Sequence, residues 1–206
     1  MKRILILLIV LTEGLNGSCQ FLTRSVRIAV SYPITTGDNF MNSNLLGGKG
    51  YSGIIDAEIE YDLFKAGSTA GGIDFNISIL KLKESEITAS GYIPGIFVQQ
   101  EFSVGKMSLI PQAGAGYSRW RYKGPDLEIE DQYGNIIHIE NKKASNGYNF
   151  QGSLRIASRN GRPVNWFLQF KYEFTRLEKP SGGELNSNFN RNFSILYPGA
   201  GISWQF

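Results

Sequence analysis

The sequence predicts an all-β fold, an eight-stranded antiparallel transmembrane β-barrel with short turns at one end and long loops at the other. Three observations lead to this prediction. Apolar residues alternate with small or polar ones in eight segments, the connections between the segments alternate in length, and charged residues occur on only one face of the segments. A closed barrel satisfies its own backbone hydrogen bonds, as a chain in lipid must do.

The chain begins with the features of a secretory signal. Lys2 and Arg3 precede an apolar run over residues 4–11, and small residues follow this run. A basic start, a short apolar core and small residues at the cleavage point are typical of an exported precursor. We expect residues 1–19 to be a signal peptide and residues 20–206 to form one barrel domain. Alternatively, Cys19 stays and carries lipid, although Asn16 stands where a lipidation motif has Leu.

The remainder of the chain is rich in glycine and aromatic residues and only modestly charged. Its formal net charge of +3 is too weakly basic to indicate a nucleic-acid partner. No apolar run of about 18 residues follows the signal, so the sequence predicts no transmembrane helix. With cleavage after Cys19, the mature chain has no cysteine and can form no disulfide.

Eight segments show the two-residue period of a strand with one apolar and one polar face. They are residues 26–32, 55–63, 73–79, 92–102, 109–117, 148–156, 164–174 and 196–206. Most have about 7–11 residues, close to the roughly 9–11 that a tilted strand needs to cross a bilayer. In the last segment Ile202, Trp204 and Phe206 share the apolar face, and Tyr197 is the one bulky residue on the other face.

The connections between these segments are alternately long and short. Residues 33–54, 80–91, 118–147 and 175–193 form the long ones, and the short ones centre on residues 65–69, 103–106 and 158–163. Outer-membrane barrels have short periplasmic turns, longer extracellular loops and an even number of strands. The pattern therefore favours an outer-membrane barrel with both chain ends on the periplasmic side.

The distribution of charged residues between the two strand faces distinguishes this barrel from a soluble one. The polar face carries ten charged residues and the apolar face none: Arg27, Asp56, Glu58, Glu60, Asp62, Asp74, Glu101, Arg155, Lys171 and Glu173. A lipocalin-like or avidin-like barrel would have to bury the bulky apolar face in an interior that eight strands leave only just fillable. Because small and polar residues suit a narrow lumen, we expect the apolar face to contact outer-membrane lipid.

Eight of the charged residues form a predicted network in the lumen. They are Arg27, Asp56, Glu58, Glu60, Asp62, Arg155, Lys171 and Glu173. Unpaired charges are costly in a narrow interior, so acids and bases should meet there. One interpretation is a path for ions. We favour the other, a salt-bridged plug, because eight strands enclose little more than side chains.

The longest connection contains a predicted hairpin. Residues 127–131 and 136–140 alternate around Tyr133, Gly134 and Asn135, which form a turn signal. The arms have too few apolar residues to cross an apolar band about 25 Å tall. We therefore predict that residues 127–140 protrude beyond the membrane instead of adding two membrane strands. The exposed edge could pair with an extracellular or envelope protein.

No motif in the sequence indicates catalysis. His138 is the single histidine and has strand-like neighbours, and no cluster of Cys or His offers a metal site. The acidic residues near the hairpin could bind calcium loosely, but their spacing is not that of a calcium-binding loop. We expect no enzyme activity, no cofactor and no resident metal.

Two motifs carry a family resemblance, LIPQAGAGYSRW at residues 109–120 and GISWQF at the end of the chain. With them, the mature chain resembles the OmpA/OmpX-like eight-stranded family, particularly the small barrel-only outer-membrane proteins of Bacteroidetes. The resemblance implies that Ile202, Trp204 and Phe206 form an assembly signal read by the barrel assembly machinery.

These motifs specify architecture and not activity, so three classes of function stay open. A structural or interaction barrel acting through its extracellular loops is the favoured class. A small pore or transporter for small solutes is the alternative, and an embedded enzyme has the least support.

Overall fold

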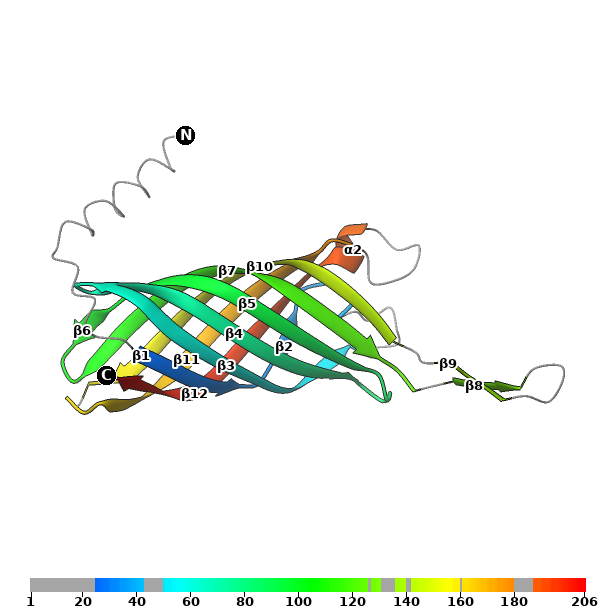
Figure 1. Cartoon of the computed structure of the whole chain (residues 1–206), viewed down its shortest axis with the longest axis horizontal. Helices are drawn as coiled ribbons and strands as arrows, with labels where there is room; N and C mark the ends of the chain where they lie inside the picture. The colour runs from blue at the N-terminus through cyan, green and yellow to red at the C-terminus, as the bar shows by residue number, and fades with distance from the viewer. Residues whose placement is uncertain are drawn as a thin grey trace, which may run out of the picture.

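The computed structural model describes residues 25–42, 50–125, 127–130, 136–139, 142–159, 161–179 and 187–206. Its eight long strands are β1 (Ser25–Ser31), β3 (Tyr51–Ala66), β4 (Thr69–Leu82), β5 (Thr88–Gln100), β7 (Met107–Lys123), β10 (Lys142–Ser158), β11 (Val164–Leu177) and β12 (Asn192–Gln205). Each strand pairs antiparallel with the next, and β1 pairs with β12 to close the sheet (Figure 1). The predicted eight-stranded antiparallel barrel is confirmed. The predicted signal peptide, residues 1–19, lies outside the described residues.

Three short elements accompany the eight strands. β2 (Ile34–Thr36) follows β1 after Pro33 and pairs with β12, and β6 (Phe102–Val104) continues the line of β5 and pairs with β7. The helix α2 (Ser187–Arg191), which the sequence did not predict, leads directly into β12. Within the described ranges, no helix is long and apolar enough to cross a membrane.

The two ends of the barrel differ as predicted. Short turns join β3 to β4, β5 to β7 and β10 to β11, and β1 starts and β12 ends at this same end (Figure 1). Gly67 and Gly105 in two of these turns have φ values of 58° and 62°, a left-handed conformation that favours glycine. Three long connections lie at the other end, but the predicted long connection over residues 80–91 is wrong: β4 runs to Leu82 and β5 begins at Thr88, so only residues 83–87 join them. Since long loops face outward in outer-membrane barrels, the short-turn end is periplasmic.

Some strands extend further than the sequence predicted. β7 reaches Lys123 and β10 begins at Lys142, and these two residues are register partners. Much of the predicted 118–147 loop is therefore strand. The prediction ended the strand at Tyr117 because the next outward residues, Arg119 and Arg121, are not apolar. Backbone pairing continues beyond the apolar band although the side-chain pattern changes there.

The predicted hairpin forms its own small sheet. β8 (Leu127–Glu130) pairs antiparallel with β9 (Ile136–Ile139), and the pair projects beyond the long-loop end of the barrel (Figure 1). As predicted, the arms protrude and do not add two further membrane strands. The predicted turn at residues 133–135 lies outside the described residues.

The two faces of each strand have opposite exposure. On β11 the outward side chains Leu168 and Phe170 are 48% and 57% exposed, whereas the intervening Gln169 is 1% exposed. The outward apolar residues surround the barrel on all eight strands: Ile28, Ile59, Phe75, Ile96, Leu109, Phe150, Leu168 and Ile202 are examples. A soluble barrel would bury such residues, so this arrangement supports a lipid-facing wall.

Candidate functional site: the lumen

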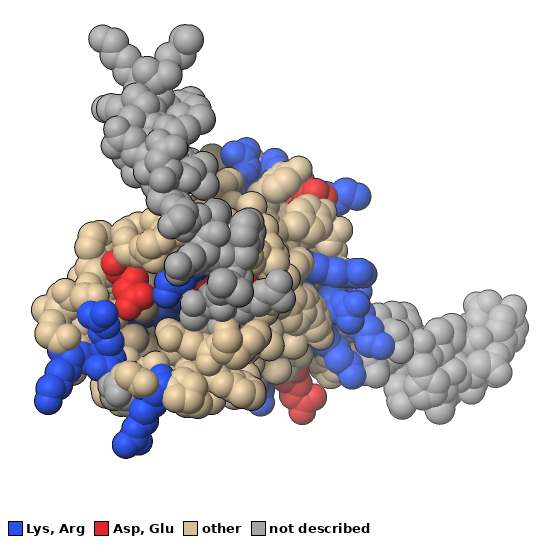
Figure 2. All heavy atoms as spheres, turned by 60° about the vertical axis from the view of Figure 1, so that its left-hand side comes forward, with Lys and Arg blue, Asp and Glu red and all other residues tan. Residues whose placement is uncertain are grey.

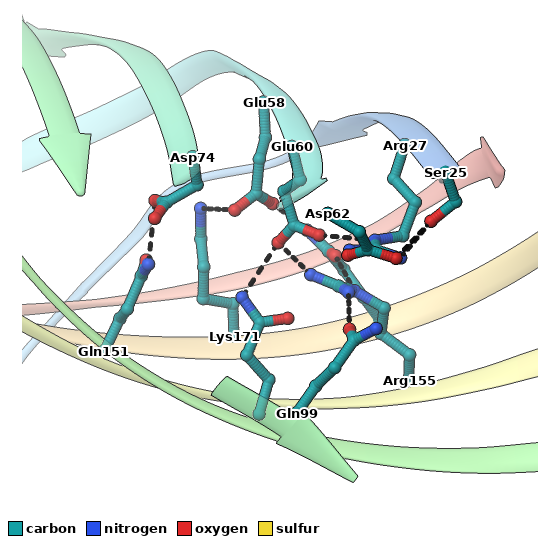
Figure 3. A network of polar contacts seen from close by, with 12 residues as sticks. Ser25, Arg27, Glu58, Glu60, Asp62, Asp74, Gln99, Gln151, Arg155 and Lys171 are labelled. Atoms are coloured by element: carbon teal, nitrogen blue, oxygen red, sulfur yellow. Dashed lines mark hydrogen bonds and ion pairs between the residues drawn. The ribbon is translucent and has the colours of Figure 1, made fainter. Parts of the chain in front are cut away.

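The inward residues of β3 supply most of the charge in the lumen. Its two-residue period places Asp56, Glu58, Glu60 and Asp62 on one face, and β1, β10 and β11 supply Arg27, Arg155, Lys171 and Glu173. All eight predicted residues point inward and none is more than 6% exposed. Their ion pairs form two successive layers, and Figure 3 shows the pairs made by Arg27, Arg155 and Lys171.

The layer nearer the periplasm is built around Glu60, and we call it the Glu60 layer. Its Oε2 lies 2.6 Å from Nε of Arg27, and its Oε1 forms an ion pair with Nη2 of Arg155. Arg27 also pairs with Asp62 through Nη2 and donates through Nη1 to the same carboxylate over 3.1 Å. The single carboxylate of Glu60 therefore bridges two guanidinium groups across the lumen, that of Arg27 on β1 and that of Arg155 on β10.

Neutral side chains complete this layer. Gln112 donates to Glu60 Oε1 over 2.9 Å. Arg155 donates to Gln99 over 3.2 Å and to Gln169 over 3.1 Å. Arg27 donates to the Ser25 hydroxyl over 2.8 Å, so both buried cations have neutral acceptors besides their carboxylates, which offsets part of their desolvation cost.

The second layer lies deeper and has a single cation. Lys171 Nζ is 3.2 Å from Glu58 Oε1 and 3.6 Å from Asp56 Oδ1. The same Nζ lies 4.7 Å from the centre of the Tyr197 ring, a distance typical of a cation–π contact. This contact explains the bulky residue that departs from the small or polar pattern of the inward face of the terminal strand.

Acids outnumber bases in this second layer. Glu173 is buried and accepts a 3.3 Å hydrogen bond from Thr175, and Asp74 accepts a 2.8 Å hydrogen bond from Gln151. Among the described residues, six buried carboxylates share the lumen with three buried cations: Asp56, Glu58, Glu60, Asp62, Asp74 and Glu173 with Arg27, Arg155 and Lys171. The excess of acid is therefore concentrated around Lys171.

Small inward residues make room for these long side chains. A Cβ on Gly95 would lie 2.7 Å from the Asp74 carboxylate, and one on Gly114 would lie 2.7 Å from the Gln151 amide. Both positions are thus restricted by the neighbour that fills the space. At these two positions, glycine leaves room for a lumen side chain.

An apolar layer lies in the lumen towards the long loops. Ten buried residues form it: Met41, Leu80, Ala89, Ile93, Trp120, Tyr122, Leu177, Phe193, Ile195 and Tyr197. The rings of Trp120 and Phe193 meet edge to face with centroids 5.1 Å apart, and Phe40 packs against Phe193 at 5.7 Å. We call this layer the apolar cap. The sequence analysis did not predict it, and Tyr197 was the one signal it noted.

The periplasmic end is hollow. A cavity of about 600 Å³ opens there, and its lining includes Arg27, Asp62, Ser108 and Arg155 but not Lys171. The cavity therefore stops at the Glu60 layer. We call it the periplasmic vestibule, and Figure 2 brings this end of the barrel forward.

The predicted assembly residues lie on the outer wall. Ile202 and Trp204 pair with Ile28 and Val26 of β1 and are 52% and 58% exposed. Phe206 follows the last residue of β12 and its ring lies 6.1 Å from that of Trp204. These side chains form one apolar row beside the seam that closes the barrel.

The described residues add no metal-binding cluster. No group of three or more His, Cys, Asp or Glu among them is placed to hold a metal ion. His138 belongs to β9, but its side chain lies outside the described part of the structure.

Comparisons with known proteins agree with the architecture. No protein-family model and no curated protein matches the sequence. Neisserial surface protein A has a similar solved structure, with a TM-score of 0.60 and 12% identity over 89% of this chain and 97% of that one. A major outer membrane protein from Thermus thermophilus gives a TM-score of 0.53 and 10% identity over 89% of this chain and 99% of that one.

At these identities the likeness concerns the fold alone. It agrees with the closed sheet, the apolar outer wall and the unequal ends described above. The chain therefore has the fold of the small eight-stranded outer-membrane β-barrels.

Proposed function

We propose that this protein is an integral outer-membrane barrel with a blocked lumen, which acts as a structural or interaction protein through its extracellular loops. The observation that carries the proposal is the presence of two layers of side chains across the lumen. The Glu60 layer joins opposite walls of the barrel, and the apolar cap lies between that polar interior and the long loops.

Both layers are costly to open. Breaking a buried ion pair by removing one partner costs about 3–5 kcal/mol, and Glu60 takes part in two such pairs. Separating the aromatic rings of the cap would expose apolar surface in a close-packed interior. The interior therefore supports a stabilising role, and the extracellular face is left for recognition.

The β8–β9 hairpin is the segment best suited to recognition. It has only two strands, so each strand has an unpaired outer edge to which a strand of another protein could add. We infer that the hairpin over residues 127–140 contacts an extracellular or envelope protein.

Two experiments test this function. In planar bilayers, the purified mature chain should show no steady conductance, and steady single-channel steps would contradict the proposal. In cells, residues 124–141 can be replaced by a short Gly-Ser linker, because Lys123 and Lys142 are register partners and end the barrel strands side by side.

The linker variant should fold normally but lose its partner. Its heat-modifiable gel migration should equal that of the wild type, which shows a folded barrel. Proteins cross-linked to the wild type on intact cells should be missing from the variant. Identical cross-linked partners for both chains would contradict a role for the hairpin.

One observation favours a small pore as a second candidate. The periplasmic vestibule is already open, and deeper in the lumen both amide atoms of the buried Asn76 side chain have no hydrogen-bond partner among the described residues. Polar groups of this kind can accommodate water. Conductance in the wild type that increases in Trp120→Ala, a substitution in the apolar cap, would support the pore.

A further inference from the structure

Basic side chains are concentrated on the outward face of two adjacent strands at the extracellular end. Beyond Tyr117, the outward row of β7 continues with Arg119, Arg121 and Lys123, all of which are exposed. Lys142 of β10 is exposed and lies beside Lys123 in register. We call these four residues the rim patch. Figure 2 shows one group of basic side chains on the right-hand side of the barrel, separated by uncharged wall from others at the near end.

The rim patch lies directly above an aromatic pair. Tyr117 and Tyr148 are register partners on β7 and β10, are 41% and 57% exposed, and their rings meet edge to face at 5.8 Å. Exposed aromatic residues at this position belong to the girdle that marks the membrane interface. The apolar band therefore ends at this pair on this side of the barrel.

The height of the patch follows from strand geometry. With a rise of ~3.3 Å per residue and a tilt of ~40°, two residues along a strand span roughly 5 Å along the membrane normal. Arg119 and Arg121 thus have their Cα atoms about 5 and 10 Å beyond that of Tyr117. The headgroup region adds roughly 5–7 Å to each side of the hydrocarbon core, so both side chains can reach lipid phosphates.

Three cations of the patch, all on β7, are available to an external anion. Among the described residues, no acidic side chain forms an ion pair with Arg119, Arg121 or Lys123. The guanidinium group of Arg121 lies 5.3 Å from the centre of the Tyr92 ring, which holds it against the outer wall. This contact with the face of the ring leaves the N–H donors of the guanidinium able to bind an anion.

We propose that Arg119 and Arg121 of the rim patch bind the phosphate groups of anionic lipid in the outer leaflet. Arg side chains can bind phosphate with two parallel hydrogen bonds, and the patch faces sideways, where lipid and not a soluble partner surrounds the barrel. A Lys or Arg near an anionic membrane surface contributes ~1 kcal/mol, so removal of each charge should weaken binding about fivefold.

The test compares three lipid probes with the full mature chain in detergent micelles. The probes are bisphosphorylated lipid A, lipid A without phosphate, and phosphatidylcholine. Native mass spectrometry should show that the wild type retains the bisphosphorylated lipid, and that Arg119→Gln with Arg121→Gln weakens retention about 30-fold. Arg119→Lys with Arg121→Lys should keep most of it, which also shows that the strand end tolerates substitution.

A matched control removes two charges at the other end of the barrel. Lys106 and Arg159 are exposed in neighbouring periplasmic turns, where the Arg159 N–H donates to the Lys106 carbonyl over 2.8 Å. Lys106→Gln with Arg159→Gln should leave lipid retention unchanged.

Three results would overturn the proposal. They are equal retention of lipid A with and without phosphate, an equal loss in the control variant, and displacement of the lipid by an equal concentration of inorganic phosphate. The last result would assign the patch to a free anion. Retention that survives excess inorganic phosphate supports a lipid site.

Discussion

The stability of the barrel should depend strongly on the charge of one lumen carboxylate and little on the charge of another. Glu60 and Asp74 are register partners on β3 and β4, and both are buried, at 1% and 4% exposure. Glu60 is paired with Arg27 and Arg155, whereas Asp74 accepts a hydrogen bond from the neutral Gln151. Replacing each acid by its amide keeps the size of the side chain and changes the charge.

The expected magnitudes follow from these partners. Glu60→Gln leaves Arg155 with only neutral acceptors and removes one of the two carboxylates beside Arg27, so unfolding should become easier by about 3–5 kcal/mol. Asp74→Asn removes an acid that has no cation paired with it, and its remaining amide oxygen can still accept from Gln151. The free energy of unfolding should change by less than about 1 kcal/mol, or rise.

Urea unfolding in lipid vesicles, followed by tryptophan fluorescence and by heat-modifiable gel migration, measures both variants. Arg155→Ala provides a further check, because it removes one of the two cations paired with Glu60 and should cost about as much as Glu60→Gln. Similar destabilisation by Glu60→Gln and Asp74→Asn would refute the claim that pairing, and not carboxylate burial as such, determines the contribution of each acid.

The remaining predictions concern the wall, the second layer and the assembly row. Leu168→Arg at mid-strand on the outward face should cost about 2–4 kcal/mol in unfolding titrations from vesicles, whereas Val164→Arg at the strand end should cost about 0–1 kcal/mol; equal costs would contradict a lipid-facing wall. Lys171→Met leaves two buried acids without their cation and should lower the free energy of unfolding by several kcal/mol; an unchanged titration would contradict the pairing. Deleting Phe206, which continues the row of Trp204, should impair assembly in cells, measured by surface protease accessibility, far more than refolding of purified protein into detergent; normal assembly in cells would show that Phe206 is not part of the signal.

The two faces of the barrel could be predicted from the sequence because a strand has a two-residue period. One bulky row such as Trp166, Leu168 and Phe170 is enough to identify the lipid side, and the charges of the other row then lie inside. The sequence also indicated that acids and bases should meet. It could not indicate that Glu60 meets both Arg27 and Arg155, because contacts across a lumen depend on the stagger of strands far apart in the chain.

The apolar cap and the rim patch escaped prediction for a related reason. Trp120 and Phe193 lie on the inward face where the strands rise above the membrane. Arg119 lies on the outward face, and the residues before and after it point inward. In that region the apolar residues turn inward and the polar ones outward, as in a soluble barrel. The side-chain pattern therefore reverses while the backbone pairing continues, and a search for apolar outward residues ends too early.

The closed lumen can be tested most directly with single cysteines and a membrane-impermeant thiol reagent in oriented vesicles. Ser108 lines the periplasmic vestibule, and Ser78 is fully buried and faces Asp56 in register beyond the Glu60 layer. In a chain without Cys19, Ser108→Cys should react from the periplasmic side only, and Ser78→Cys should react from neither side until urea unfolds the barrel. Labelling of Ser78→Cys in the folded barrel from both sides would show a continuous aqueous path and would contradict a blocked lumen.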